Sequence, residues 1–153
     1  AWCDDYQENQ ITIVYDTMWE GTRRVADAIA SGIVEVDKDV TVKVFNIAKT
    51  DKNDVATEVF KSKMVVVGSP TVGNDMLGSV AGFLHFLRSL KMKKKSAASF
   101  GCYGWTGEAP QKIGEYLKGA GYNIVDDPLR VKWNPDLENL DLAKQMGMRL
   151  AKA

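Results

Sequence analysis

The stretch Ile11-Thr12-Ile13-Val14-Tyr15-Asp16-Thr17-Met18-Trp19-Glu20-Gly21-Thr22 decides how the rest of this chain is read. Its first five residues are an apolar run that predicts a buried strand, and residues at helical spacing follow the loop. The loop contains hydroxyl groups and a glycine. Such a strand–loop–helix unit gathers backbone N–H groups and the positive end of a helix dipole around one point. We therefore expect a bound phosphate there, although a plain turn with a threonine cap fits this loop equally well.

Strand and helix patterns alternate along the remaining chain. Strands are predicted at 11–15, 40–45, 64–67 and 97–102, with a last strand at 124 and 129–133 that is interrupted around 126–128. Helices are predicted at 22–34, 78–90, 108–119 and 136–152, with a short helix through Val55 and Phe60 that Asp51 or Asn53 caps. This alternation predicts a three-layer α/β sandwich around a five-stranded parallel sheet of order 2-1-3-4-5.

Two local features carry further expectations. Gly32 weakens the first helix and is expected to begin its end. The charge run Lys91-Met92-Lys93-Lys94-Lys95 is expected to be a solvated loop. Residues 1–9 have no periodicity, so we interpret them as a linker remnant from an upstream domain and residues 10–153 as one domain.

Composition excludes several classes of function. The chain has 153 residues, and Lys plus Arg equals Asp plus Glu at 20 each, which argues against a general nucleic-acid binder. No apolar run is long enough to cross a membrane, and we expect a cytoplasmic protein. His85 is the only histidine, and Cys3 and Cys102 form no CxxC pair, so we expect no metal site. No residue is assigned a catalytic role.

Glycine-rich loops follow the third and fourth strands, in Gly68-Ser69-Pro70-Thr71-Val72-Gly73-Asn74-Asp75 and Gly101-Cys102-Tyr103-Gly104-Trp105-Thr106-Gly107-Glu108. In a doubly wound sheet these loops meet the phosphate loop at the carboxyl edge of the strands. Glycine lets backbone approach a flat ligand closely, and Tyr103 and Trp105 offer rings that can stack on it. The phosphate loop lacks both the Walker spacing and GxGxxG. A phosphate monoester with a flat ring, such as flavin mononucleotide (FMN), therefore fits best.

The chain resembles the flavodoxin-like domain of the flavodiiron proteins, among them the flavorubredoxins. The matching motifs are Tyr15-Asp16-Thr17-Met18, Gly68-Ser69-Pro70-Thr71 and Phe100-Gly101-Cys102-Tyr103-Gly104-Trp105-Thr106-Gly107-Glu108-Ala109. The resemblance covers essentially the whole chain and implies the flavodoxin-like form of the sandwich predicted above. Glu20, Gly73 and Cys102 depart from the usual family pattern.

The resemblance also implies which residues bind the cofactor. The phosphate would be held by Thr17, Met18, Trp19, Glu20, Gly21 and Thr22. One side of the isoalloxazine would be lined by Ser69, Pro70, Thr71, Val72, Gly73 and Asn74. The other side would be lined by Gly101, Cys102, Tyr103, Gly104, Trp105 and Gly107.

In this family the flavin domain follows a domain that holds two irons, and FMN passes electrons to the diiron site, where dioxygen or nitric oxide is reduced. The resemblance thus implies an electron-transfer module, cut from its diiron domain. Its partners would be that diiron domain, contributed by the second subunit of a head-to-tail dimer, and rubredoxin or a reductase as electron donor. Two alternatives stay open: a stand-alone FMN-dependent reductase of the quinone reductase type, and a receiver-like signalling domain.

Overall fold

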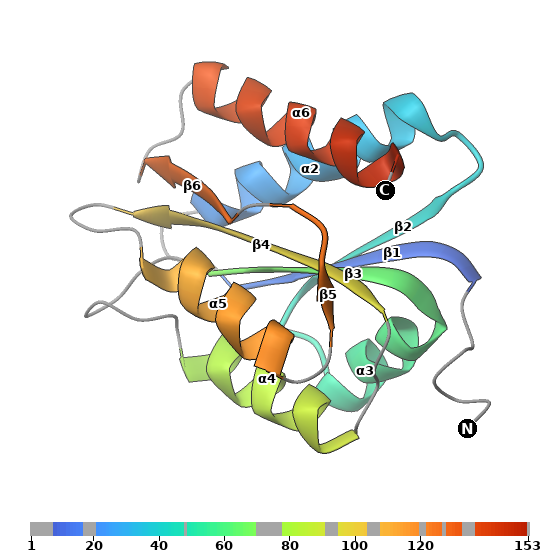
Figure 1. Ribbon diagram of the computed structural model, residues 1–153, viewed down its shortest axis with the longest axis vertical. Helices are drawn as coiled ribbons and strands as arrows, with labels where there is room; N and C mark the ends of the chain where they lie inside the picture. Colours follow the sequence, from blue (N-terminus) through green and yellow to red (C-terminus); the bar gives the residue numbers. More distant parts are fainter. Residues whose placement is uncertain are drawn as a thin grey trace.

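The computed structural model describes residues 8–16, 21–47, 49–69, 78–90, 95–103, 108–119, 122–126, 128–132 and 137–152. A parallel sheet lies between helices α2 and α6 on one face and α3, α4 and α5 on the other (Figure 1). The strands are β1 (Glu8–Tyr15), β2 (Thr41–Asn46), β3 (Ser62–Gly68), β4 (Ser96–Tyr103), β5 (Asn123–Ile124) and β6 (Leu129–Lys132). The helices are α2 (Gly21–Val36), α3 (Lys52–Lys61), α4 (Gly78–Leu90), α5 (Glu108–Gly119) and α6 (Leu137–Lys152).

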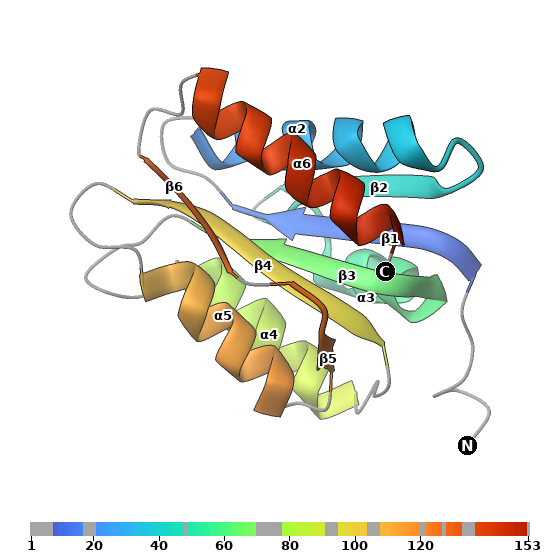
Figure 2. The same ribbon diagram turned by 45° about the horizontal axis from the view of Figure 1, so that its top comes forward.

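The strand order is β2-β1-β3-β4-β5, with β6 also paired to β4, which confirms the predicted flavodoxin-like topology. The interruption predicted around residues 126–128 divides the last strand in two. β5 pairs in parallel with the start of β4 and β6 with its end, so two short strands share the fifth position of the sheet. Figure 2 shows both lying along β4.

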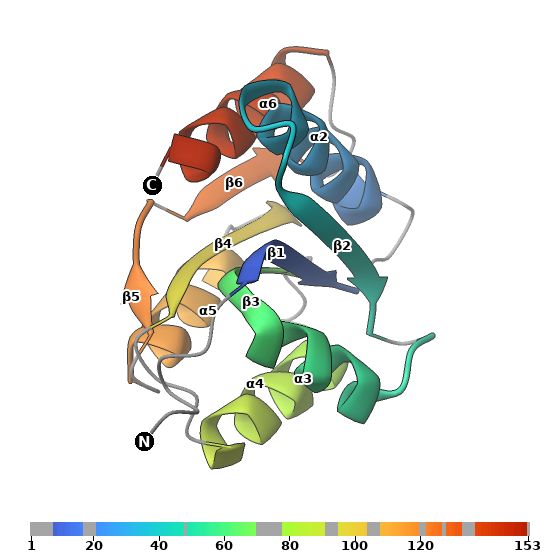
Figure 3. The ribbon, with the colours of Figure 1, turned by 90° about the vertical axis from the view of Figure 1, so that its right-hand side faces the viewer.

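The sheet has a hydrophobic core on each face because its inner strands are apolar on both sides. Ile11 and Ile13 of β1 join the core beneath α2 and α6, whereas Val14 joins the core beneath α3, α4 and α5. In β3 the run 64–67 is buried on both faces. A continuous apolar run is what a strand covered by helices on both faces requires. Figure 3, viewed along the strands, shows the three layers.

The structure corrects two element boundaries. α2 continues to Val36, so Gly32 does not begin its end; the glycine instead lies against the backbone of α6 near Lys144. β1 begins at Glu8, which pairs with Ser62 of β3, so two of the nine residues that we interpreted as a linker belong to the first strand.

The expected solvated loop at 91–95 is wrong for its last residue, and residues 91–94 lie outside the described part. Lys95 is fully buried at the amino edge of the sheet. Its Nζ donates to the carbonyl oxygens of Phe60 and Ser62, each at 2.7 Å, and lies 5.8 Å from the centroid of the Phe60 ring. Burial lowers the pKa of the Lys95 ammonium.

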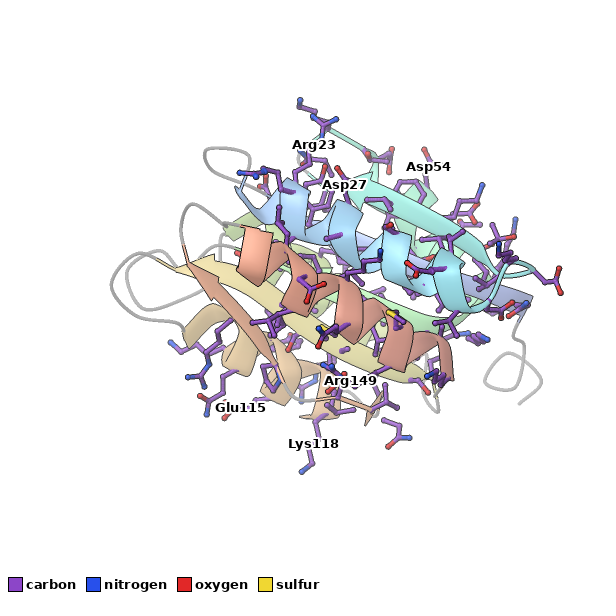
Figure 4. All side chains as sticks on the ribbon, turned by 90° about the horizontal axis from the view of Figure 1, so that it is seen from above. Arg23, Asp27, Asp54, Glu115, Lys118 and Arg149 are labelled. Atoms are coloured by element: carbon purple, nitrogen blue, oxygen red, sulfur yellow. The ribbon has the colours of Figure 1, made fainter. Side chains whose placement is uncertain are left out.

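Charged side chains cover the outer surface of the helices. Figure 4 shows Arg23 and Asp27 on α2, Asp54 on α3, and Glu115 and Lys118 on α5, all of them exposed. Arg149 of α6 is also exposed and makes an ion pair with Asp126, with 3.0 Å between Nε and Oδ2. None of the described helices combines the length and the apolar character needed to cross a bilayer. The expected cytoplasmic location stays a prediction.

Candidate functional site

The carboxyl ends of β1, β3 and β4 lie side by side. Tyr15 is the partner of Gly68, and Gly68 is the partner of Phe100. Hydrogen bonds continue one residue further, because the amide of Asp16 donates to the Gly68 carbonyl and the amide of Ser69 to the Phe100 carbonyl, each at 3.3 Å. The loops that follow β1 and β3 therefore leave the sheet from adjacent points, as the sequence predicted.

β4 extends beyond the point where β3 ends at Gly68. The predicted fourth strand ends at Cys102, and the structure carries β4 one residue further, to Tyr103, with residues 101–103 paired in parallel with 130–132 of β6. At about 3.3 Å per residue, β4 and β6 project roughly 10 Å past the end of β3. The candidate site is thus bounded on one side by a two-stranded wall, which exists because β6 resumes the sheet after the interruption. The loop after β4 starts from the end of this wall.

Helix α2 directs its amino end toward the same edge. It begins at Gly21, shortly after β1 ends at Tyr15, and runs back over the sheet (Figure 2). Its first turn contains no acidic residue. Unpaired amides and the helix dipole at such an end attract an anion, and a carboxylate there would compete with it. The charge distribution of the described first turn therefore suits a phosphate group.

At the carboxyl edge, the core beneath α2 and α6 has two buried aromatic residues on either side of a glycine. Tyr15 and Phe100 are buried in the same core, and Gly68 lies between their strands. A Cβ atom on Gly68 would collide with the tip of the Phe100 ring. Only glycine at position 68 leaves room for the ring. This contact was not predicted from the sequence, where its signal is a single large side chain in a strand of small residues, Ser96-Ala97-Ala98-Ser99-Phe100-Gly101.

Six of the predicted cofactor-binding residues fall within the described part. Gly21 and Thr22 open α2, Ser69 directly follows β3 and is fully buried, and the others close β4: Gly101, Cys102 and Tyr103. The remaining ones lie outside the described residues: Thr17, Met18, Trp19, Glu20, Pro70, Thr71, Val72, Gly73, Asn74, Gly104, Trp105 and Gly107. Each of the three predicted loops thus has at least one residue in the described part, and the cofactor contacts of all the predicted residues stay predictions.

The described residues offer little for a metal site or for acid–base catalysis at this edge. They contain no group of three or more His, Cys, Asp or Glu that could hold a metal ion. His85 lies exposed on α4, with Nδ1 3.3 Å from the Tyr116 hydroxyl. Lys95 precedes β4 and Tyr122 precedes β5, so both of these buried groups lie at the amino edge, away from the candidate site.

Comparison with known proteins agrees with this geometry. The family model described as flavodoxin matches residues 13–146. The anaerobic nitric oxide reductase flavorubredoxin of Klebsiella pneumoniae is 46% identical over 151 residues, which are 99% of this chain and 31% of that protein. The chain thus spans about a third of the length of the curated relatives that it matches.

Two solved structures show the same fold in larger proteins. The rubredoxin oxygen:oxidoreductase of Desulfovibrio gigas superposes with a TM-score of 0.90 at 31% identity, covering 96% of this chain and 36% of that one. The flavodiiron protein of Giardia intestinalis superposes with a TM-score of 0.88 at 29% identity, covering 98% and 37%. The chain therefore belongs to the flavodoxin family and is similar, over nearly its whole length, to the flavodoxin-like part of the flavorubredoxins.

Proposed function

We propose that this chain binds FMN at the carboxyl edge of its sheet and serves as an electron-transfer module. The observation that carries the proposal is the convergence at this edge of three strand ends and the amino end of α2, in a chain of the flavodoxin family. Predicted cofactor-binding residues from each of the three loops lie at these strand and helix ends, which supports the proposal. FMN, when bound, supplies one-electron and two-electron redox chemistry, whereas the polypeptide binds, orients and tunes it.

The described residues fit the two ends of FMN. The first turn of α2 has main-chain amides without helical partners, includes Thr22 and contains no carboxylate. These features suit a phosphate monoester. The buried start of the loop after β3 and the projecting end of β4 are the bases of the two loops that we propose to line the flat ring. The assignment of individual contacts to residues 17–22, 69–74 and 101–107 is part of this proposal.

The partners follow from the relatives. The similar proteins are an anaerobic nitric oxide reductase flavorubredoxin, a rubredoxin oxygen:oxidoreductase and a flavodiiron protein. We propose that the chain passes electrons to a diiron domain that reduces nitric oxide or dioxygen. The diiron domain would come from the second subunit of a head-to-tail dimer, and the donor would be rubredoxin or a reductase.

Titrating the purified chain with FMN and, separately, with riboflavin tests the binding site. Thr22→Val should weaken FMN binding but leave riboflavin binding nearly unchanged, because riboflavin has no phosphate. Trp105→Ala should weaken the binding of both flavins. Thr41→Val is the control, since Thr41 is exposed at the opposite edge of the sheet, at the start of β2. Equal affinities in all four proteins would refute the site, and a chain that binds neither flavin would refute the function.

A further inference from the structure

We infer that the contact between Phe100 and Gly68 positions the loops after β3 and β4, and so keeps the correct spacing between the two sides of the flavin ring. Neither residue belongs to the set predicted to contact the cofactor. The inference rests on the proposed function, because it concerns the same site. It is carried by a side-chain contact, a main-chain hydrogen bond and the place of both in the sheet.

The first step is the steric fit of ring and glycine. A Cβ atom on Gly68 would lie less than 3.0 Å from three ring atoms of Phe100 (Cζ, Cε2 and Cε1), too close for any real contact. Phe100 is fully buried, and its neighbours in the core include Met64, Ala98 and the partly buried Leu129. A ring enclosed in this way cannot swing aside cheaply, because interiors are densely packed. A methyl group added at Gly68 would therefore push the paired ends of β3 and β4 apart.

The second step connects the contact to the loop. The carbonyl oxygen of Phe100 accepts a hydrogen bond from the amide of Ser69 at 3.3 Å, and Ser69 is itself fully buried. Residue 100 thus holds the β3 end by its ring and the first residue of the following loop by its main chain. A displacement of the Phe100 main chain would move Ser69, and with it the base of the loop proposed to line the isoalloxazine.

The same contact affects the loop proposed for the opposite side of the flavin ring. β4 continues from Phe100 through residues 101–103, which carry the other proposed flavin contacts. A displacement between β3 and β4 therefore changes the spacing of the two loops that face each other across the flavin. Sites whose supporting residues are loosened by about 1 Å lose much of their function. Phe100 acts through these loops and is a positioning residue, not a contact residue.

The test compares Gly68→Ala with Gly32→Ala. Both changes add one methyl group where it collides with buried atoms, but Gly32 lies against α6, near the far end of α2. Flavin affinity, the midpoint potentials of the bound flavin and its visible spectrum are measured together with thermal stability. Gly68→Ala should weaken FMN and riboflavin binding alike, at least about tenfold, and shift the potentials. Gly32→Ala should lower stability and leave these properties unchanged.

Phe100→Leu provides the second variant, with Phe83→Leu as its control, because Phe83 is equally buried but belongs to the other core. Phe100→Leu should weaken flavin binding, and the double variant with Gly68→Ala should bind more tightly than Gly68→Ala alone, because the shorter side chain frees space for the added methyl group. If Gly68→Ala fails to fold, the comparison of the two phenylalanine variants decides.

Two negative results have different meanings. If the unaltered chain binds no flavin, the proposed function fails and this inference fails with it. If the unaltered chain binds FMN but Gly68→Ala and Phe100→Leu match their controls in affinity and potential, the positioning role alone is overturned.

Discussion

Gly32 of α2 and Gly147 of α6 lie at the point where these two helices come closest, each against the backbone of the opposite helix. A Cβ atom on Gly32 would overlap the carbonyl oxygen of Lys144, and one on Gly147 would overlap the carbonyl oxygen of Ile29. The contact is reciprocal, since Gly147 lies between Lys144 and Met148, the residues nearest to Gly32. Figures 1 and 2 show the two helices side by side above the sheet. Without side chains at the crossing, the helices pack backbone to backbone.

Replacing either glycine should therefore destabilise the fold. We expect Gly32→Ala and Gly147→Ala each to lower the free energy of unfolding by about 2–3 kcal/mol, because the methyl group forces the helices apart. The gain in helix propensity, at most about 1 kcal/mol, offsets only part of this cost. Urea denaturation followed by circular dichroism measures the change.

Gly82→Ala is the matched control for this prediction. Gly82 is exposed within α4, and a Cβ atom there would have no neighbour within 4 Å. The same substitution should raise the free energy of unfolding by about 0.5–1 kcal/mol. If all three alanine variants were stabilised, the close approach of α2 and α6 would be contradicted.

Gly32 also shows where sequence interpretation ends. The periodicity of Val25, Ile29 and Ile33 predicted α2 and its buried face correctly, because amphipathic spacing reports directly on local structure. A glycine near the end of such a pattern has two explanations, a weak helix end or a close helix contact. The choice depends on α6, more than 100 residues away in sequence, and periodicity contains no information on which helices become neighbours.

Lys95 provides a second prediction. Its ammonium donates to the Phe60 and Ser62 carbonyls just where α3 ends and β3 begins, so it stabilises the carboxyl end of that helix. Lys95→Met should lower the free energy of unfolding by about 2 kcal/mol, because buried carbonyls lose a charged donor. Lys118→Met, at an exposed position on α5, should change it by no more than about 0.5 kcal/mol. Equal effects of the two variants would mean that Lys95 is solvated after all.

Tyr122 gives a prediction for alkaline pH. Its side chain is buried, no described residue offers its hydroxyl a hydrogen bond, and burial raises its pKa from 10.0 to about 12. Between these values the unfolded chain has lost the phenolic proton and the folded chain retains it. The contribution of Tyr122 to stability is therefore complete below pH 10 and is lost as the pH rises toward 12.

Tyr122→Phe isolates this contribution. At neutral pH the variant should be as stable as the unaltered chain or more stable by about 1 kcal/mol, because a buried hydroxyl without a partner is removed. Its advantage should grow as the pH is raised from about 9 to about 11. The free energy of unfolding is measured against pH for the variant and for the unaltered chain. Subtracting one curve from the other removes the opposite trend of Lys95, whose lowered pKa makes stability rise with pH. A difference that does not depend on pH would contradict the burial of the hydroxyl.

The candidate site was predictable at the level of strand ends and not at the level of contacts. Glycines and polar residues after apolar runs located the carboxyl edge, since parallel strands must all end there. The strand was predicted to within one residue of its end at Tyr103, but its projection past β3 was not, because that depends on pairing with β6 rather than on the residues of β4 themselves. The position of the Phe100 ring over Gly68 was missed for a similar reason: alternation identifies the face of a strand, not the neighbour across it.

A buried polar cluster at the amino edge yields the last prediction. The Ser62 hydroxyl donates to the Glu58 carbonyl at 2.7 Å, lies 2.6 Å from the Thr12 hydroxyl and accepts from Gln10 Nε2 at 3.1 Å. Ser62→Ala should therefore cost about 2 kcal/mol of unfolding free energy, since three partners lose a contact in a low-dielectric interior. The exposed Ser31→Ala in α2 should be neutral or slightly stabilising.

Combining Ser62→Ala with Thr12→Val separates a connected cluster from independent bonds. In a connected cluster the double variant should lose less stability than the sum of the single losses, because Thr12→Val removes the hydroxyl that Ser62→Ala leaves without its partner. The affinity for FMN should not change in any of these variants, because the cluster lies at the edge opposite the proposed site. Additive losses, or a weakened affinity for flavin, would show that the amino edge is organised differently from the contacts described.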